Sequence, residues 1–161
     1  MKAIFLDRDG TINIDYGYVY KPEELHLIDG VTESLKKLQD AGFLLIIITN
    51  QSGIGRGYFS ESDAEKYNHL LIEELKNNDI IISDVYICIH TPENLCNCRK
   101  PSPYMINKAL EKYKIDASKS YMLGDKPSDV ESGFAAGVES FLIDDNHDIG
   151  YWTDVILKKY K

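Results

Sequence analysis

Apolar and polar positions alternate in blocks along the chain, and the blocks have two typical lengths. The short blocks are nearly continuous apolar runs, which are typical of strands buried on both faces of a parallel sheet. The run FLLIIIT at residues 43–49 shows this most clearly. Runs of this kind predict strands at residues 2–7, 43–49, 84–89, 120–125 and 138–144.

The longer blocks between these strands have apolar residues at helical spacing. One of them places Val31, Leu35 and Leu38 on a single face and stops at Gly42. In another, Ser60 and Asp63 resemble a capping pair at the start of a helix. The predicted helices cover residues 30–42, 60–75, 103–114, 127–137 and 151–160.

Strands that alternate with helices predict an α/β fold, with a Rossmann-like parallel sheet and helices on both faces. The length of 161 residues is that of one ordinary domain, and no repeat or linker divides residues 1–161. In such sheets, ligands bind beyond the carboxyl ends of the strands. Polar residues directly after the predicted strands are therefore the candidates for function.

The net charge of −8 disfavours nucleic acid as a partner, because the phosphate backbone binds basic surfaces. No apolar run approaches the ~20 residues of a membrane span, so no membrane partner is expected. The start of the chain, MKAIFLDRDG, lacks the pattern of a signal peptide, which predicts a cytoplasmic location. No partner surface stands out, and a monomer is expected. A small anionic substrate is compatible with this charge if local cations surround it.

Two carboxylates follow the first predicted strand. Asp7 and Asp9 are two residues apart, and Gly10 permits a tight turn behind them. Such a pair can hold a hard divalent cation, or can divide the work of a nucleophile and a proton donor. A solvated turn is the alternative, since Asp and Gly are common in turns.

Polar groups also follow three other predicted strands. The second strand ends in Thr49 and the NQS sequence after it, whose hydroxyl and N–H groups suit phosphate oxygens. Arg99 and Lys100 follow the third strand after a loop, and fixed cations match the charge of a phosphoryl group. Asp125 and Asp129 follow the fourth strand, where they either complete a metal site or cap a helix. Their shared position at one sheet edge favours a common site.

In this order, the four groups resemble the motifs of the haloacid dehalogenase (HAD) superfamily of aspartate-nucleophile phosphatases. The resemblance covers nearly the whole chain and implies a HAD-like fold. A large cap domain is not expected, because the insertions between Asp9 and Gly30 and between Ser52 and Ser60 are short. The residues that match the four motifs, in sequence order, are Asp7 with Asp9, Thr49, Lys100, and Asp125 with Asp129.

The resemblance implies a Mg²⁺-dependent phosphatase that forms an aspartyl phosphate. Asp7 is expected to attack phosphorus, and Asp9 to protonate the leaving group and then activate water. Mg²⁺ is expected on Asp7, the backbone carbonyl of Asp9, and Asp125, while Thr49 and Lys100 neutralise the phosphoryl oxygens. The residues expected around the substrate are Asp15, Tyr16, Gly17, Tyr18, Asn50, Gln51, Ser52, Arg99 and Lys126.

The stretches LDRDGTIN, DYGYV, TNQSGIGRGYF and CRKP narrow the resemblance to two groups. One is the D,D-heptose 1,7-bisphosphate phosphatases, which remove the C7 phosphate during synthesis of ADP-heptose, a precursor of lipopolysaccharide core and surface glycans. The other is the histidinol-phosphate phosphatases of histidine biosynthesis. GYV and GIGRGYF favour the sugar bisphosphate. The loop between His90 and Cys96 is short, which is nearer to the histidinol-phosphate pattern. A sugar bisphosphate is therefore expected, with histidinol phosphate as the alternative.

Three cysteines and a histidine gather in one short segment of the sequence. Cys88, His90, Cys96 and Cys98 supply three thiolates and one imidazole, which is enough for a closed tetrahedral zinc site. Four protein ligands leave no open position for water, so a structural zinc is predicted. An odd number of cysteines does not favour a disulfide framework. Three reduced cysteines beside an unrelated histidine are the alternative.

The zinc loop and the two short insertions are expected to form a rim over the site. On this rim Tyr18 is a candidate for contact with a sugar, and Arg56 is either a ligand of a distal phosphate or a solvated side chain. A zinc-stabilised binding module with an inactive site is the rival class of function. The presence of Asp7, Lys100 and Asp125 favours the enzyme, because an inactive relative is expected to lose such residues.

Overall fold

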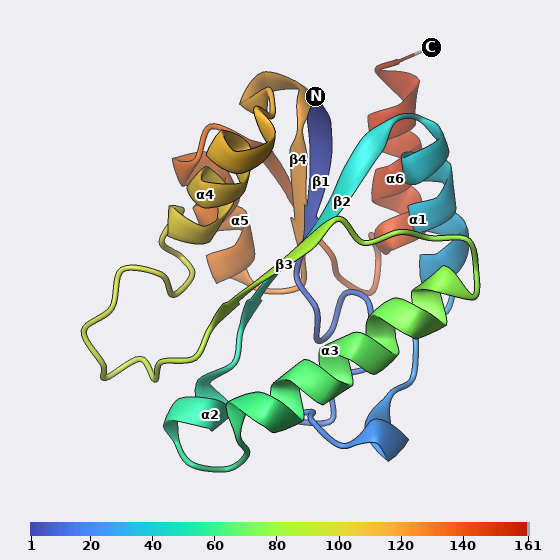
Figure 1. Cartoon of the computed structure of the whole chain (residues 1–161). Coiled ribbons are helices and arrows are strands. Elements are labelled where there is room, and N and C mark those ends of the chain that lie inside the picture. Colours follow the sequence, from blue (N-terminus) through green and yellow to red (C-terminus); the bar gives the residue numbers. More distant parts are fainter. Residues whose placement is uncertain (161) are drawn as a thin grey trace.

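The computed structural model describes residues 1–160 and has one five-stranded parallel sheet in the order β3-β2-β1-β4-β5. Figure 1 shows β1 between β2 and β4, near the middle of the sheet. The α/β class predicted from the sequence is confirmed. The strands are β1 (Lys2–Leu6), β2 (Phe43–Asn50), β3 (Asp84–Cys88), β4 (Tyr121–Gly124) and β5 (Glu139–Leu142).

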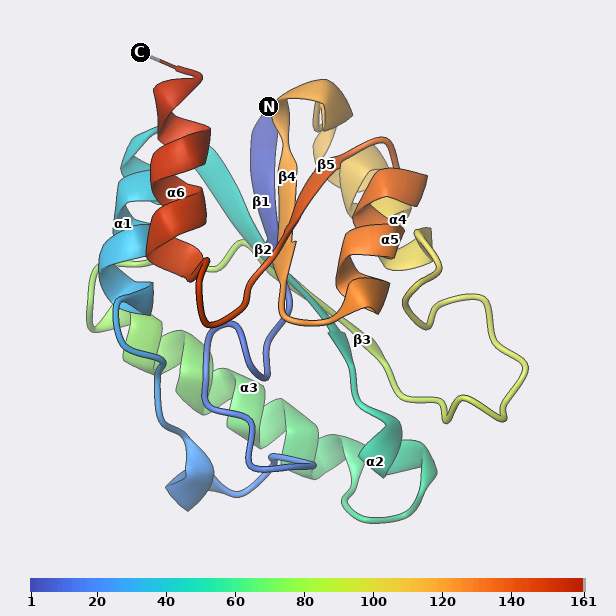
Figure 2. The same cartoon turned by 180° about the vertical axis from the view of Figure 1, so that it is seen from behind.

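Helices cover both faces of the sheet, as the alternating pattern predicted. On one side lie α1, α3 and α6, and on the other lie α4 and α5 (Figure 2). Their bounds are α1 (Val31–Asp40), α2 (Ser52–Gly55), α3 (Glu61–Lys76), α4 (Tyr104–Tyr113), α5 (Pro127–Ala135) and α6 (Ile149–Lys158), with 3₁₀ turns at Pro22–Glu24 and Ala117–Lys119.

Continuous apolar strands divide their side chains between two cores. In β1, Ile4 and Leu6 pack with α1, α3 and α6, whereas Ala3 and Phe5 pack toward α4. All four side chains are completely buried. Burying a large aliphatic or aromatic side chain stabilises a fold by about 1.5–3 kcal/mol, so both faces anchor β1. The strand is therefore a rigid base for the residues that follow it.

Two local predictions need correction, and one is confirmed. The predicted helices do not include residues 52–55, yet the glycine-rich stretch there forms the single-turn helix α2, in which Gly53 packs against the ring of Phe59 with no room for a side chain. The last helix begins at Ile149 rather than Tyr151, since Asp148 caps it by accepting a hydrogen bond from the Tyr151 N–H at 2.8 Å. The reciprocal Ser60–Asp63 capping pair at the start of α3 is present.

The long connections leave the carboxyl ends of the strands, at the bottom of Figure 1. The largest are the segment between β1 and α1 and the loop between β3 and α4, and α2 lies between them (Figure 1). None of these segments contains a further sheet or helical bundle, so the fold has a rim and no large cap domain. Among the described residues, no helix is long and apolar enough to span a bilayer.

Candidate active site

The turn after β1 brings Asp7 to the middle of the carboxyl edge. Asp7 directly follows the strand, and its backbone N–H still donates to the Leu123 carbonyl of β4 at 3.1 Å. Gly10 adopts a φ of 86°, a conformation that side chains disfavour. A Cβ on Gly10 would also overlap the carboxylate of Asp125. The glycine therefore allows the ends of β1 and β4 to approach each other closely.

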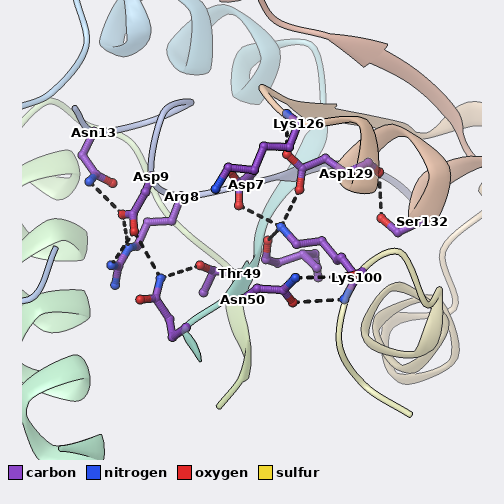
Figure 3. A network of polar contacts seen from close by, with 12 residues as sticks. Asp7, Arg8, Asp9, Asn13, Thr49, Asn50, Lys100, Lys126, Asp129 and Ser132 are labelled. Carbon is purple, nitrogen blue, oxygen red and sulfur yellow. Dashed lines mark hydrogen bonds and ion pairs between the residues drawn. The ribbon is translucent and has the colours of Figure 1, made fainter. Parts of the chain in front are cut away.

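Lys100 places a buried positive charge at this edge. Its Nζ lies 2.8 Å from Oδ1 of Asp7 and 2.6 Å from Oδ1 of Asp129, and it donates to the Ile48 carbonyl at 2.7 Å (Figure 3). Burial opposes the charged form, but the two carboxylates outweigh it, so the pKa of Lys100 is raised. Lys100 therefore remains protonated beside the predicted nucleophile.

Asn50, the last residue of β2, fixes the backbone that carries Lys100. Its Oδ1 accepts from the Lys100 N–H at 3.0 Å, and its Nδ2 donates to the Lys100 carbonyl at 3.2 Å. These two bonds join segments that are 50 residues apart. Asn50 thus has a structural task in addition to its predicted place near the substrate.

Asp129 has the helix-capping role that was one of its two predicted alternatives, and it also pairs with a buried lysine. Its Oδ2 accepts from the Lys126 N–H at 3.1 Å at the start of α5, which is the capping role. Its Oδ1 pairs with Lys100. Burial and the charge of Asp7 raise the pKa of Asp129, and Lys100 opposes that shift. One carboxylate therefore begins a helix and balances the buried lysine.

The carboxylate of Asp9 is held by donors from three residues (Figure 3). Arg8 donates from Nε to Oδ1 at 2.7 Å and from Nη2 to Oδ2 at 3.1 Å. Asn13 donates to Oδ1 at 3.0 Å, and Gln51 approaches Oδ2 at 3.4 Å. The same amide of Gln51 donates to the hydroxyl of Thr49 at 2.7 Å. Gln51 therefore connects the first and second motifs.

Three carboxylates, those of Asp7, Asp125 and Asp129, have oxygens within 4.8 Å of one another. Burial, followed by the hydrogen bond and charge of Asp7, raises the pKa of Asp125 to about 7. Oδ1 of Asp125 is buried without a hydrogen-bond partner among the described residues. An uncompensated oxygen in a cluster of hard oxygen donors fits a divalent cation such as Mg²⁺. The side chain of Asp9 is not in this cluster, so its predicted metal contact is confined to its backbone carbonyl.

Two adjoining cavities open beside these groups. The inner one has a volume of about 110 Å³, and its lining includes the predicted catalytic residues Asp7, Asp9, Thr49 and Lys100. The outer one, of about 250 Å³, extends toward the loop after β1. The predicted substrate residues that line one or both are Asp15, Gly17, Tyr18, Asn50, Gln51, Ser52, Arg99 and Lys126.

Tyr16 is a predicted substrate residue that lines neither of these cavities. Its exposed ring packs edge-on against His26, with ring centroids 5.9 Å apart. The next tyrosine of the loop, Tyr18, packs in the same manner against Tyr58 at 4.8 Å. The loop after β1 and the segment after α2 therefore meet at the rim through Tyr18, while Tyr16 lies outside.

The predicted zinc ligands come together at the end of β3. One atom from each of Cys88, His90, Cys96 and Cys98 lies within 4.8 Å of the others. The Sγ atoms of Cys88 and Cys98 are 2.9 Å apart, and Nδ1 of His90 is 3.4 Å from the latter. Burial raises the pKa of the Cys88 thiol, whereas the backbone N–H of Arg99 lowers that of Cys96. Three thiols and an imidazole are the ligand types that zinc prefers, and zinc binds the thiolate form.

Comparison with known proteins identifies the family. Residues 13–137 match the haloacid dehalogenase-like hydrolases. The chain belongs to this hydrolase family. The predicted superfamily is thereby confirmed.

The hydrolase is similar to relatives with specific names. It is 44% identical over 139 residues to a probable D-glycero-D-manno-heptose-1,7-bisphosphate 7-phosphatase of Thermoplasma volcanium, covering 86% of this chain and 94% of the relative. It is 43% identical to the D-glycero-beta-D-manno-heptose-1,7-bisphosphate 7-phosphatase of Haemophilus ducreyi, covering 88% and 82%. A crystal structure of the D,D-heptose 1,7-bisphosphate phosphatase from B. bronchiseptica, complexed with magnesium and phosphate, superposes with a TM-score of 0.90 at 25% identity over 99% of both chains.

Some site residues of this hydrolase were not predicted from the sequence. Ser128 lines the inner cavity beside Lys126. Arg8, between the two predicted catalytic aspartates, is completely buried, although an arginine at a strand end is ordinarily solvated. Its burial depends on contacts with Asn68, 60 residues away, which no local pattern reveals.

Proposed function

We propose that this hydrolase removes the C7 phosphate of D-glycero-D-manno-heptose 1,7-bisphosphate and releases the 1-phosphate. The names of relatives that are 43–44% identical over most of the chain carry this proposal. These names support the sugar bisphosphate as the substrate, and they give no support to histidinol phosphate. The product would serve the synthesis of ADP-heptose for surface glycans.

The first half-reaction transfers the phosphoryl group to the protein. A carboxylate oxygen of Asp7 forms a bond to phosphorus as the bond between phosphorus and the C7 oxygen breaks. The proton of the Asp9 carboxyl group moves to the departing oxygen, so the sugar leaves as a neutral alcohol. Lys100, which contacts Asp7, balances negative charge on the phosphoryl oxygens together with the Thr49 hydroxyl. The product of this half is an acyl phosphate on Asp7.

The second half-reaction restores the enzyme. The carboxylate of Asp9 takes a proton from water, and the water oxygen forms a bond to phosphorus. The bond between phosphorus and Asp7 breaks at the same centre, which releases inorganic phosphate and regenerates the Asp7 carboxylate. Asp9 is again protonated, ready for the next substrate.

The carboxylates of Asp7 and Asp125 and the backbone carbonyl of Asp9 would hold Mg²⁺. When bound, the ion supplies charge that offsets the repulsion between an anionic nucleophile and an anionic phosphate. Asp129 supports this arrangement through its ion pair with Lys100, at 2.6 Å.

Cations near the cavities support a substrate with a second phosphate. Lys100 contacts the reacting centre, while Arg99 and Lys126 line the inner cavity and are not paired with carboxylates in the described part of the chain. Arg56 lies 3.9 Å from Glu93, so it links α2 to the zinc loop across the rim. We assign the distal phosphate to Arg99 and Lys126.

Zinc on Cys88, His90, Cys96 and Cys98 would have a structural role. Four protein ligands would fill the coordination shell of zinc, so no position would remain for water or substrate. The loop that they close carries Arg99 and Lys100 directly after its last ligand. The metal would therefore stabilise the segment that presents the two cations. A monomeric state and a cytoplasmic location remain predictions.

A side-by-side assay tests the substrate. Release of inorganic phosphate is measured with D-glycero-D-manno-heptose 1,7-bisphosphate and with histidinol phosphate, in the presence of Mg²⁺. We expect kcat/KM to be higher for the heptose bisphosphate. A higher value for histidinol phosphate would overturn the substrate and leave the phosphatase chemistry in place. No phosphate release from either compound would overturn the proposed function.

A further inference from the structure

Arg8 has a buried charge that the reaction steps above do not use. Its side chain is completely shielded from solvent, although it lies one residue from both Asp7 and Asp9. A buried guanidinium is tolerated only when its donors are satisfied. Arg8 meets this condition with partners on two sides. On one side it contacts Asp9, and on the other it contacts residues of α3.

On one side, Arg8 donates two hydrogen bonds to the carboxylate of Asp9. Nε and Nη2 donate to the two different oxygens of the carboxylate, at 2.7 and 3.1 Å. This two-point contact fixes the plane of the carboxyl group, which a single hydrogen bond does not do. Oδ1 also accepts from Asn13 at 3.0 Å, whereas Oδ2 has only a long second contact from Gln51 at 3.4 Å. Oδ2 is therefore the oxygen with capacity left for a proton.

On the other side, Arg8 is anchored to α3. Nη1 donates to Oδ1 of Asn68 at 2.9 Å, and the guanidinium lies 4.5 Å from the ring centroid of Tyr67. Nη2 also donates to the Val19 carbonyl at 2.9 Å. Tyr67 and Asn68 are both buried on the face of α3 that meets this loop. The guanidinium thus cannot turn without breaking contacts to another element.

We propose that Arg8 is a positioning residue, anchored by Asn68 and Tyr67 of α3, that holds the Asp9 carboxyl group in the plane required for proton transfer. The inference rests on the proposed function, in which Asp9 protonates the sugar oxygen. A proton donor must be aligned with the departing oxygen. Loss of the two-point contact between Arg8 and Asp9, called the Arg8 fork below, therefore lowers the rate of that proton transfer. Binding of the phosphates is not affected directly, because Arg8 lines neither cavity.

Leaving groups of different basicity separate positioning from a general structural role. The sugar alkoxide needs a proton as it departs, whereas 4-nitrophenolate is a stable anion and needs little help. For both substrates, kcat/KM reports the steps up to phosphorylation of Asp7. A variant that misplaces Asp9 loses activity mainly on the sugar phosphate. A variant that merely reduces the folded fraction loses activity on both substrates equally.

Arg8→Lys is the main variant, because lysine keeps the charge and lacks the fork. We expect kcat/KM for heptose bisphosphate to fall about 100-fold, and by at least about ten-fold more than kcat/KM for 4-nitrophenyl phosphate. KM for the bisphosphate should change little. Wild-type values, or equal losses on the two substrates, would overturn the proposal.

Asn68→Ala tests the anchor without touching Asp9, and it keeps the question answerable if Arg8→Lys does not fold. This variant should also lose more kcat/KM on the heptose bisphosphate than on 4-nitrophenyl phosphate, but the loss should be smaller than in Arg8→Lys. His69→Ala, at the exposed neighbour on α3, is the matched control and should leave both kcat/KM values unchanged. An Asn68→Ala enzyme with the wild-type ratio of the two values would also overturn the proposal. A wild-type enzyme that releases no phosphate would instead refute the proposed function.

Discussion

Asp7 and its neighbours illustrate how much a single residue decides in this site. Asn at position 7 is nearly isosteric with Asp, yet an amide cannot form the acyl phosphate. We expect Asp7→Asn to lower kcat by about a thousandfold or more while the fold and substrate binding persist. Phosphate release and calorimetric binding of the bisphosphate measure these two properties.

Asp40→Asn is the matched control for that substitution, because Asp40 is exposed on α1 and, among residues 1–160, pairs only with Lys36 across one helical turn. It should retain wild-type turnover. Activity of Asp7→Asn close to wild type would refute the nucleophile assignment. Loss of both turnover and binding would instead indicate that Asp7 is needed mainly to hold Lys100 in place.

Arg99 is the residue at which substrate choice is best tested. A charge-assisted contact of about 1.5–3 kcal/mol corresponds to a factor of ten or more in affinity. We expect Arg99→Ala to raise KM for the heptose bisphosphate about ten-fold or more, and to change KM for a small monophosphate little. Steady-state kinetics on the two substrates decide this. Equal effects on both would place Arg99 at the reacting phosphoryl group.

At the scale of elements, the zinc loop should behave as a stabilising unit. Cys98→Ala removes one of four ligands and should lower Tm by about 5–10 °C, since loss of a few kcal/mol shifts Tm by a few degrees each. Leu95→Ala, at a fully exposed position in the same loop, is the control and should not change Tm. Elemental analysis of protein purified without chelator should find zinc, and protein without zinc would contradict the site.

Elements were predictable where one local cause dominates. The apolar runs fixed the strands because burial on both faces leaves few polar positions, and Ser60 with Asp63 marked the start of α3. The turn of α2 is not among the predicted helices because its glycines are typical of loops, and its packing on Phe59 is a tertiary contact. The early start of α6 depends on the cap from Asp148, beyond the apolar pattern.

At the scale of the whole molecule, the site could be located because the topology of a parallel sheet gathers strand ends at one edge. This topology brings Asp7, Thr49, Lys100 and Asp125 together at that edge. Topology alone does not determine which side chains are in contact. Arg8 is held by Asn68, which is 60 positions away, and the hydrogen bonds of Asn50 to the Lys100 backbone span 50 positions. Such contacts follow from packing, which sequence periodicity does not encode.

The acidic cluster links the metal to the pH dependence of the whole fold. In the metal-free protein the pKa of Asp125 is about 7, well above its ordinary value of 3.8, and that of Asp129 is raised as well. At pH values between the ordinary pKa and the raised pKa of Asp125, the folded chain binds more protons than the unfolded chain. The free energy of unfolding therefore decreases as the pH rises from about 4 to 7.

We expect Tm of the chelator-treated protein to decrease between pH 5 and pH 7.5. Mg²⁺ should raise Tm more at pH 7.5 than at pH 5, because the ion binds the deprotonated carboxylates and competes with their protons. Asp125→Asn should weaken both effects, since the amide neither titrates nor offers a charged ligand. Thermal unfolding monitored by circular dichroism, with and without Mg²⁺ at the two pH values, measures them. A stabilisation by Mg²⁺ that is equal at both pH values would show that the ion does not compete with protons at this cluster.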